Sequence, residues 1–116
     1  PLMRVFVLLA LLIIATPAMA QDLRVRVRAL TVTETDSCSN CTPGNMHTSY
    51  WTIYEAKVKH VISGQLDEKV IHFAFAQHAQ YTPEALKDLV VYLRPAPPWL
   101  RTQFQVDYEA SDVAFR

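Results

Sequence analysis

The residues best suited to chemistry in this chain are two cysteines separated by two residues, Cys38 and Cys41. A C-x-x-C pair can exchange thiols and disulfides when a helix N-terminus lowers the pKa of the first thiol. It can also form a small structural disulfide, because two intervening residues let the side chains meet in a turn. A third possibility is a soft metal site that recruits Met46 and His47. The pair lies in a polar stretch without a helix start, which favours the structural disulfide and leaves the redox and metal sites as alternatives.

Other residue sets typical of enzymes are missing from the sequence. No nucleophile, base and acid stand at a recognisable spacing, and the only two glycines, Gly44 and Gly64, provide no Gly-rich phosphate loop. Structural zinc normally takes four ligands, and no fourth accompanies Cys38, Cys41 and His47 at a recognisable spacing. We therefore predict a protein that is not an enzyme and that holds neither a metal nor another cofactor.

Aromatic and basic side chains on one predicted strand are the second candidate for function. In the run from Tyr50 to Ile62, Trp51 has the same parity as Lys57 and Lys59, and Trp99 follows a run of prolines. We predict that both tryptophans are exposed and that Trp51, Lys57, Lys59 and Trp99 form a binding surface. Such a surface could hold a peptide, a sugar or a partner protein. The alternative is that Trp51 packs beneath the loop that carries the cysteines.

These residues belong to a predicted antiparallel hairpin. In the first strand, residues 50–62, charged and apolar side chains alternate, which is the period of a half-buried strand. In the second, residues 70–77, Phe73 and Phe75 share a face, which we assign to the core. A polar turn that contains Gly64 joins the two strands, as expected for a hairpin.

A further strand is predicted before the hairpin, from about residue 22 to residue 33. Arg24, Arg26 and Arg28 alternate there with apolar residues, and the phase slips near Ala29, which predicts a bulge. We interpret the arginines as a solvated face that discourages edge pairing, in preference to an anion site. Residues 34–48 are polar and are predicted to be a loop.

After the hairpin, the sequence predicts one helix and two strands. Thr82 and Pro83 suit the start of a helix of about two turns, over residues 82–88. Strands are expected at 89–93 and 102–109, separated by a proline-rich segment. One helix between the third and fourth of five strands predicts an all-β fold, a five-stranded OB-like Greek-key barrel.

Part of this pattern resembles a known family. Ala56, Val58, Val61 and Gly64, followed by the run from Leu89 to Pro95, resemble the netrin-like modules related to tissue inhibitors of metalloproteinases, which also occur in small exported bacterial proteins. The resemblance covers about residues 50–95 and implies an OB-like fold. The inhibitors present an N-terminal cysteine to the zinc of their target, whereas this mature chain is expected to begin at Gln21. The resemblance therefore assigns no functional residue.

The N-terminal residues are typical of an export signal. Arg4 is followed by an apolar run from Val5 to Ala15 and by an A-x-A end at Ala18 and Ala20. Eleven apolar residues are fewer than the roughly 20 that span a bilayer. We predict a signal peptide over residues 1–20, a soluble OB-like domain over residues 21–116 and a periplasmic or secreted protein.

The charge balance limits the expected partners. Without Arg4, ten Lys and Arg residues face eleven Asp and Glu residues, so the domain has no general attraction for nucleic acid or for an anionic membrane. We expect a monomer without a membrane span that binds an envelope or extracellular protein, or a small ligand. In an oxidising compartment a disulfide is the default state of a cysteine pair, and a redox or metal-handling protein is the alternative function.

Overall fold

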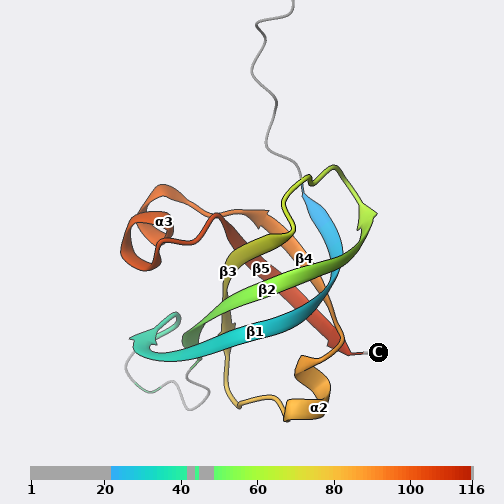
Figure 1. Cartoon of the computed structure of the whole chain (residues 1–116). Coiled ribbons are helices and arrows are strands. Elements are labelled where there is room, and N and C mark those ends of the chain that lie inside the picture. Colours follow the sequence, from blue (N-terminus) through green and yellow to red (C-terminus); the bar gives the residue numbers. More distant parts are fainter. Residues whose placement is uncertain (1–21, 42–43, 45–48, 116) are drawn as a thin grey trace, which may run out of the picture.

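The structure is a computed structural model that describes residues 22–41, 44 and 49–115. The predicted signal peptide and the candidate ligands Met46 and His47 lie outside these residues. The described residues form five strands and two short helices (Figure 1). In chain order these are β1 (Leu23–Cys38), β2 (Tyr50–Ser63), β3 (Val70–Gln77), α2 (Pro83–Leu86), β4 (Leu89–Pro95), α3 (Pro98–Phe104) and β5 (Tyr108–Phe115).

The strands close into a barrel in the order β1-β2-β3-β5-β4, with β4 pairing back to β1. Four of these pairings are antiparallel, and the fifth, between β3 and β5, is parallel and short. It joins Phe73 to Tyr108 and Ala74 to Glu109. The predicted all-β, OB-like barrel is therefore confirmed.

The barrel interior is filled by the inward-facing side chains of all five strands. Phe73 is fully buried, and its ring stacks on that of Tyr54 with 4.9 Å between centroids. Phe75 is half-buried against the same core, so the predicted inner face of the third strand is correct. The Tyr54 hydroxyl donates a hydrogen bond to Gln77 Oε1, and burial raises the pKa of Tyr54. The rest of the buried cluster consists of Leu23, Val25, Val27, Ala56, Ile71, Leu89, Val91, Leu93 and Ala110.

Strand β1 is longer than predicted. The predicted bulge is present, because the pairing register with β2 shifts between Ala29 and Thr31. The expected loop is wrong for residues 34–38, which continue the strand as far as the pairing of Cys38 with Tyr50. The hydroxyl of Thr35 donates to the carbonyl oxygen of Trp51 at 2.6 Å. Polar residues can extend this strand because β2 supplies their backbone partners while water reaches their side chains.

Helix α2 begins where it was predicted but is shorter. The hydroxyl of Thr82 accepts a hydrogen bond from the backbone N–H of Ala85 at 3.2 Å, and Pro83 occupies the first helical position. The helix ends at Leu86, after one turn and not two, because the chain must reach β4 at Leu89.

The predicted fifth strand, residues 102–109, is wrong. Its first residues belong to α3, and the true β5 begins at Tyr108. Phe104 ends the helix, Gln105 then takes a left-handed conformation with φ 56°, and Val106 is buried under α3. The apolar residues at 104, 106 and 108 imitate strand alternation, although a helix end and a chain reversal separate them. The described chain consequently has two short helices where one was predicted.

Candidate functional site

The cysteine pair forms a disulfide at the end of β1. Cys38 is the last residue of the strand, and its Cα atom lies 5.6 Å from that of Cys41. The adjoining backbone is tied to the chain before β2, because Ser39 N–H donates to Ser49 O at 2.9 Å and Ser49 N–H donates to Asn40 Oδ1 at 2.7 Å. Cys38 thus ends a strand and does not lie at a helix N-terminus, the position that stabilises a thiolate.

We expect the double substitution of Cys38 and Cys41 by serine to lower the free energy of unfolding by no more than about 2 kcal/mol, because the disulfide closes a very short loop. Urea unfolding of the oxidised protein and of the variant measures this difference. The reduced Cys38 thiol is expected to react slowly with iodoacetamide at pH 6, as an ordinary thiol does, because no helix N-terminus lies beside it. Rapid alkylation at pH 6 together with reduction of insulin would instead identify a redox site.

The two tryptophans come together, but only one is exposed. Trp51 keeps its predicted outward parity on β2, yet only 6% of its surface is exposed because α3 covers it. Trp99, on α3, is 55% exposed, and its ring meets that of Trp51 edge-on with centroids 6.0 Å apart. The predicted exposure of Trp51 is therefore wrong. This outer cluster also contains Ala74, Ala96, Leu100 and Val106.

Lys57 and Lys59 do not share a surface with the tryptophans. Lys57 lies six positions after Trp51 on β2, which is about 20 Å along a strand. The four residues predicted to form one binding surface therefore divide into an aromatic site at α3 and a basic site near the far end of β2.

The lysines belong to a larger cationic surface on β1 and β2. The two strands pair antiparallel, which places Arg28 directly opposite Lys57 and Arg26 opposite His60. We define the basic face as Arg24, Arg26, Arg28, Lys57, Lys59 and His60.

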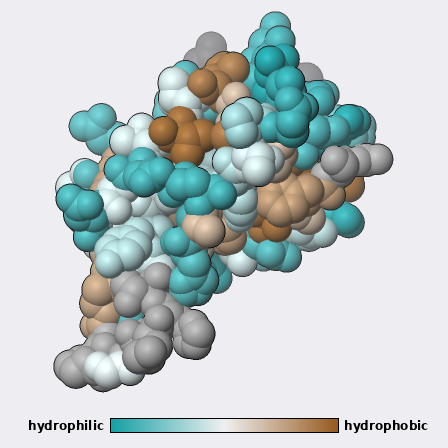
Figure 2. All heavy atoms as spheres, turned by 90° about the horizontal axis from the view of Figure 1, so that it is seen from below, coloured by the Kyte–Doolittle hydropathy of each residue, from teal (hydrophilic) through white to brown (hydrophobic). Residues whose placement is uncertain are grey.

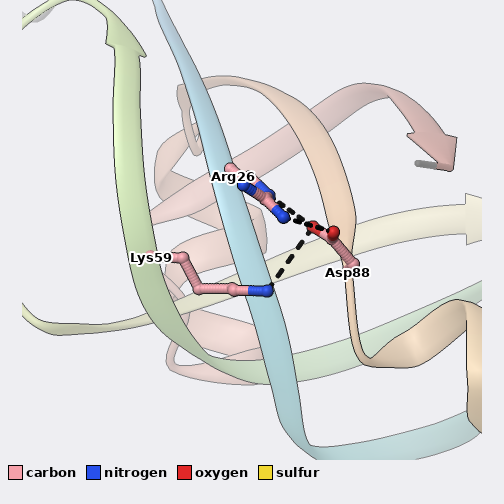
Figure 3. A network of polar contacts seen from close by, with 3 residues as sticks. All are labelled: Arg26, Lys59 and Asp88. Carbon is pink, nitrogen blue, oxygen red and sulfur yellow. Dashed lines mark hydrogen bonds and ion pairs between the residues drawn. The ribbon is translucent and has the colours of Figure 1, made fainter.

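Asp88, just before β4, provides the carboxylate that pairs with this face (Figure 3). Arg26 donates two hydrogen bonds of 2.6 Å to Asp88, one to each carboxylate oxygen. Lys59 Nζ lies 3.7 Å from Asp88 Oδ1. These hydrogen bonds, together with the negative charge of Asp88, raise the pKa of the Arg26 guanidinium. One negative charge is thus shared between two cations.

The remaining cations of the basic face are more open. Arg24 stacks over the ring of Tyr92 on β4, with its Cζ atom 5.1 Å from the ring centroid. Arg28 and Lys57 are exposed and form no ion pair within the part of the chain that the structure describes. The closeness of Arg28 to Lys57 could have been inferred from the sequence only by aligning β1 with β2. It is the register between the two strands that brings the arginines beside the lysines.

Large exposed apolar side chains are dispersed over the molecule. Viewed from the α2 side, hydrophobic residues reach the surface in separate patches among hydrophilic ones (Figure 2). None of the described helices is long and apolar enough to cross a membrane. Within residues 22–41, 44 and 49–115, no group of three or more His, Cys, Asp and Glu residues is placed to hold a metal ion. The large exposed apolar side chains that form the separate patches are those of Leu30, Tyr50, Ile62, Val70, Trp99 and Phe115.

No family model, curated protein or solved structure matches this chain. The resemblance to netrin-like modules therefore stays a prediction and assigns no function to this chain.

Proposed function

We propose that this protein is an exported, non-enzymatic binding module that uses its basic face to dock an acidic segment of a partner protein. The observation that carries the proposal is the direct pairing of two exposed cations, Arg28 and Lys57, on neighbouring strands. Like charges placed directly opposite each other destabilise a sheet. A binding partner of opposite charge would relieve this repulsion, and the relief would add to its affinity.

Protection of a strand edge does not account for the start of this arginine stripe. Residues Leu23–Val27 of β1 pair with β4 on one side, and the same stretch pairs with β2 on the other. Arg24 and Arg26 therefore lie on an interior strand of the sheet, where no free edge needs protection.

The repulsion between any two neighbouring cations of the basic face is small, but it adds up over the whole face. Alternate residues of a strand are about 7 Å apart, and two unit charges at that separation repel by about 0.6 kcal/mol in water. Asp88 offsets part of this repulsion at Arg26 and Lys59. Arg24, Arg28 and Lys57 keep their charges available to a ligand.

An acidic protein segment suits this face better than a nucleic acid or a membrane. The whole chain has eleven basic and eleven acidic residues, so the positive charge is a local patch and not a general field. A local patch on two strands matches a short run of carboxylates, and complementary charges of this kind raise association rates and select the partner.

Binding of a fluorescent poly-glutamate peptide tests the proposal. We expect saturable binding at low salt that weakens as salt rises, because the Debye length shortens to about 10 Å at 0.1 M. The double variant Arg28→Gln/Lys57→Gln should bind about tenfold more weakly, a loss of about 1.4 kcal/mol. Its melting temperature should be equal or higher, because the variant removes a like-charge pair.

The matched control is Lys87→Gln/Arg101→Gln, which removes two exposed cations from α2's C-terminus and from α3. It should bind as the unmodified protein does. Equal weakening by both double variants would mean that net charge, not the basic face, attracts the peptide. Stronger binding of DNA or of anionic vesicles than of the peptide would contradict the proposed class of partner.

A further inference from the structure

The basic face already holds one carboxylate, and the chain itself supplies it. Arg26 donates from Nε and from a terminal nitrogen to the two oxygens of Asp88, and Lys59 Nζ lies 3.7 Å from Oδ1 (Figure 3). This two-point contact is the geometry in which arginine recognises the carboxylate of any aspartate or glutamate, within one protein or between two. Asp88 therefore occupies a position that suits an acidic side chain of the proposed partner.

The carboxylate lies at the surface, while the backbone that carries it is anchored. The side chains of Arg26, Lys59 and Asp88 are 34%, 36% and 25% exposed, so water and a ligand can reach them. The next residue, Leu89, is fully buried in the barrel core, and the N–H of Asp88 donates to Ala85 O at 3.3 Å. Rotation about the side-chain bonds of Asp88 is then enough to release Arg26, and the fold need not change.

The exchange of one carboxylate for another costs little. Both form the same bonds to Arg26, and the water around a partly exposed ion pair keeps its net contribution to stability small. An acidic segment brings further carboxylates, which Asp88 cannot supply. Arg28 and Lys57 can receive them, because they lie opposite each other and two positions along their strands from Arg26 and Lys59. The partner therefore gains more contacts than Asp88 loses.

A purely structural ion pair is the alternative account of Asp88. The pair connects β1 with the segment between α2 and β4, across 62 positions of the sequence, and it offsets repulsion among the cations. Removal of the Asp88 charge should then strengthen the binding of an acidic peptide no more than removal of a distant negative charge does. The two accounts thus predict different affinities.

We propose that Asp88 is an internal competitor, which occupies on Arg26 and Lys59 the place that a carboxylate of the acidic partner takes in the complex. The inference rests on the proposed function, and it identifies Arg26 as the residue that holds the partner's carboxylate by two hydrogen bonds. A ligand must displace Asp88 before it binds there. The basic face consequently selects segments with several acidic side chains over isolated carboxylates.

Substitution of Asp88 by asparagine tests the competition directly. The variant keeps the shape of the side chain and removes its charge, so it should bind the fluorescent poly-glutamate peptide about fivefold more tightly than the unmodified protein does. The matched control is Asp36→Asn, which removes the same charge from an exposed residue near the other end of β1. Because exposed charges beyond the Debye length are screened, the control should bind within about twofold of the unmodified protein.

A double-mutant cycle shows whether the gain in affinity depends on Arg26. In the Arg26→Gln background, Asp88→Asn should change the affinity by less than about twofold, because no guanidinium is left to release.

Carbon NMR of the unmodified protein provides a second readout that does not depend on the folding of a variant. As the peptide saturates the protein, the carboxyl resonance of Asp88 should move towards its value in the Arg26→Gln variant. The carboxyl resonance of Asp36 should stay where it is.

Failure of the inference and failure of the proposed function give different results. The inference alone is overturned if Arg28→Gln/Lys57→Gln weakens binding while Asp88→Asn binds no more tightly than Asp36→Asn. An unchanged Asp88 carboxyl resonance at saturation, or the same gain from Asp88→Asn in the Arg26→Gln background, would also overturn it. If Arg28→Gln/Lys57→Gln binds as tightly as the unmodified protein, or if no form of the protein binds, the proposed function is wrong and the inference falls with it.

Discussion

Replacing Phe73 by alanine is expected to lower the free energy of unfolding by about 3–5 kcal/mol. Phe73 is fully buried, stacks on Tyr54 and pairs through its backbone with both β2 and β5. Truncation removes the transfer free energy of the ring and leaves a cavity that the surrounding strands can fill only in part. Because a small domain has roughly 5–15 kcal/mol of stability in total, the variant should unfold at a much lower urea concentration.

Phe115→Ala is the matched control for this substitution. The ring of Phe115 is 54% exposed and touches Tyr81 edge-on, with centroids 4.8 Å apart. Its loss should cost about 1 kcal/mol, the order of one exposed aromatic pair. Similar urea midpoints for the two variants would contradict the assignment of Phe73 to the barrel core.

The second large loss of stability is expected on substitution of Trp51. Its replacement by alanine should cost about 3–5 kcal/mol, because Trp51 is almost fully buried beneath α3 and packs in the outer cluster with Leu100. The loss of stability should be concentrated in α3. Amide hydrogen exchange should therefore accelerate at Arg101 and Gln105, whose N–H groups donate to Pro97 O and Arg101 O.

Trp99→Ala provides the comparison, because it removes the exposed member of the same pair. This variant should lose only the ring contact with Trp51, about 1 kcal/mol, and should keep the slow exchange of α3. If Trp51→Ala leaves α3 as protected as Trp99→Ala does, then α3 is held by something other than the outer cluster.

The local pattern of the sequence was sufficient for most of the barrel. Alternation identified β2, β3 and the inward face of Phe73, since the period of two in a strand does not depend on its neighbours. An apolar run that ends at prolines identified β4. The cap at Thr82 and the bulge after Ala29 were also readable, because both arise from a few adjacent residues.

Two errors came from contacts between residues far apart in the chain. Residues 104–108 alternate like a strand, but Leu100 is fully buried against the outer face of the sheet, and this packing makes residues 98–104 a helix. The same packing buries Trp51, whose outward parity had predicted exposure. Local propensity is a weak prior that tertiary packing overrides.

The sequence alone determined the fold class, the closeness of Cys38 to Cys41 and the alternation of arginines on β1. Only the tertiary structure decided which residues share a surface. The register of β1 against β2 brings Arg28 opposite Lys57, and the continuation of β1 to Cys38 places Glu34 beside Thr52. The physical reason is that register depends on hydrogen bonds and core packing between strands distant in sequence, whereas side-chain alternation depends on the backbone of a single strand.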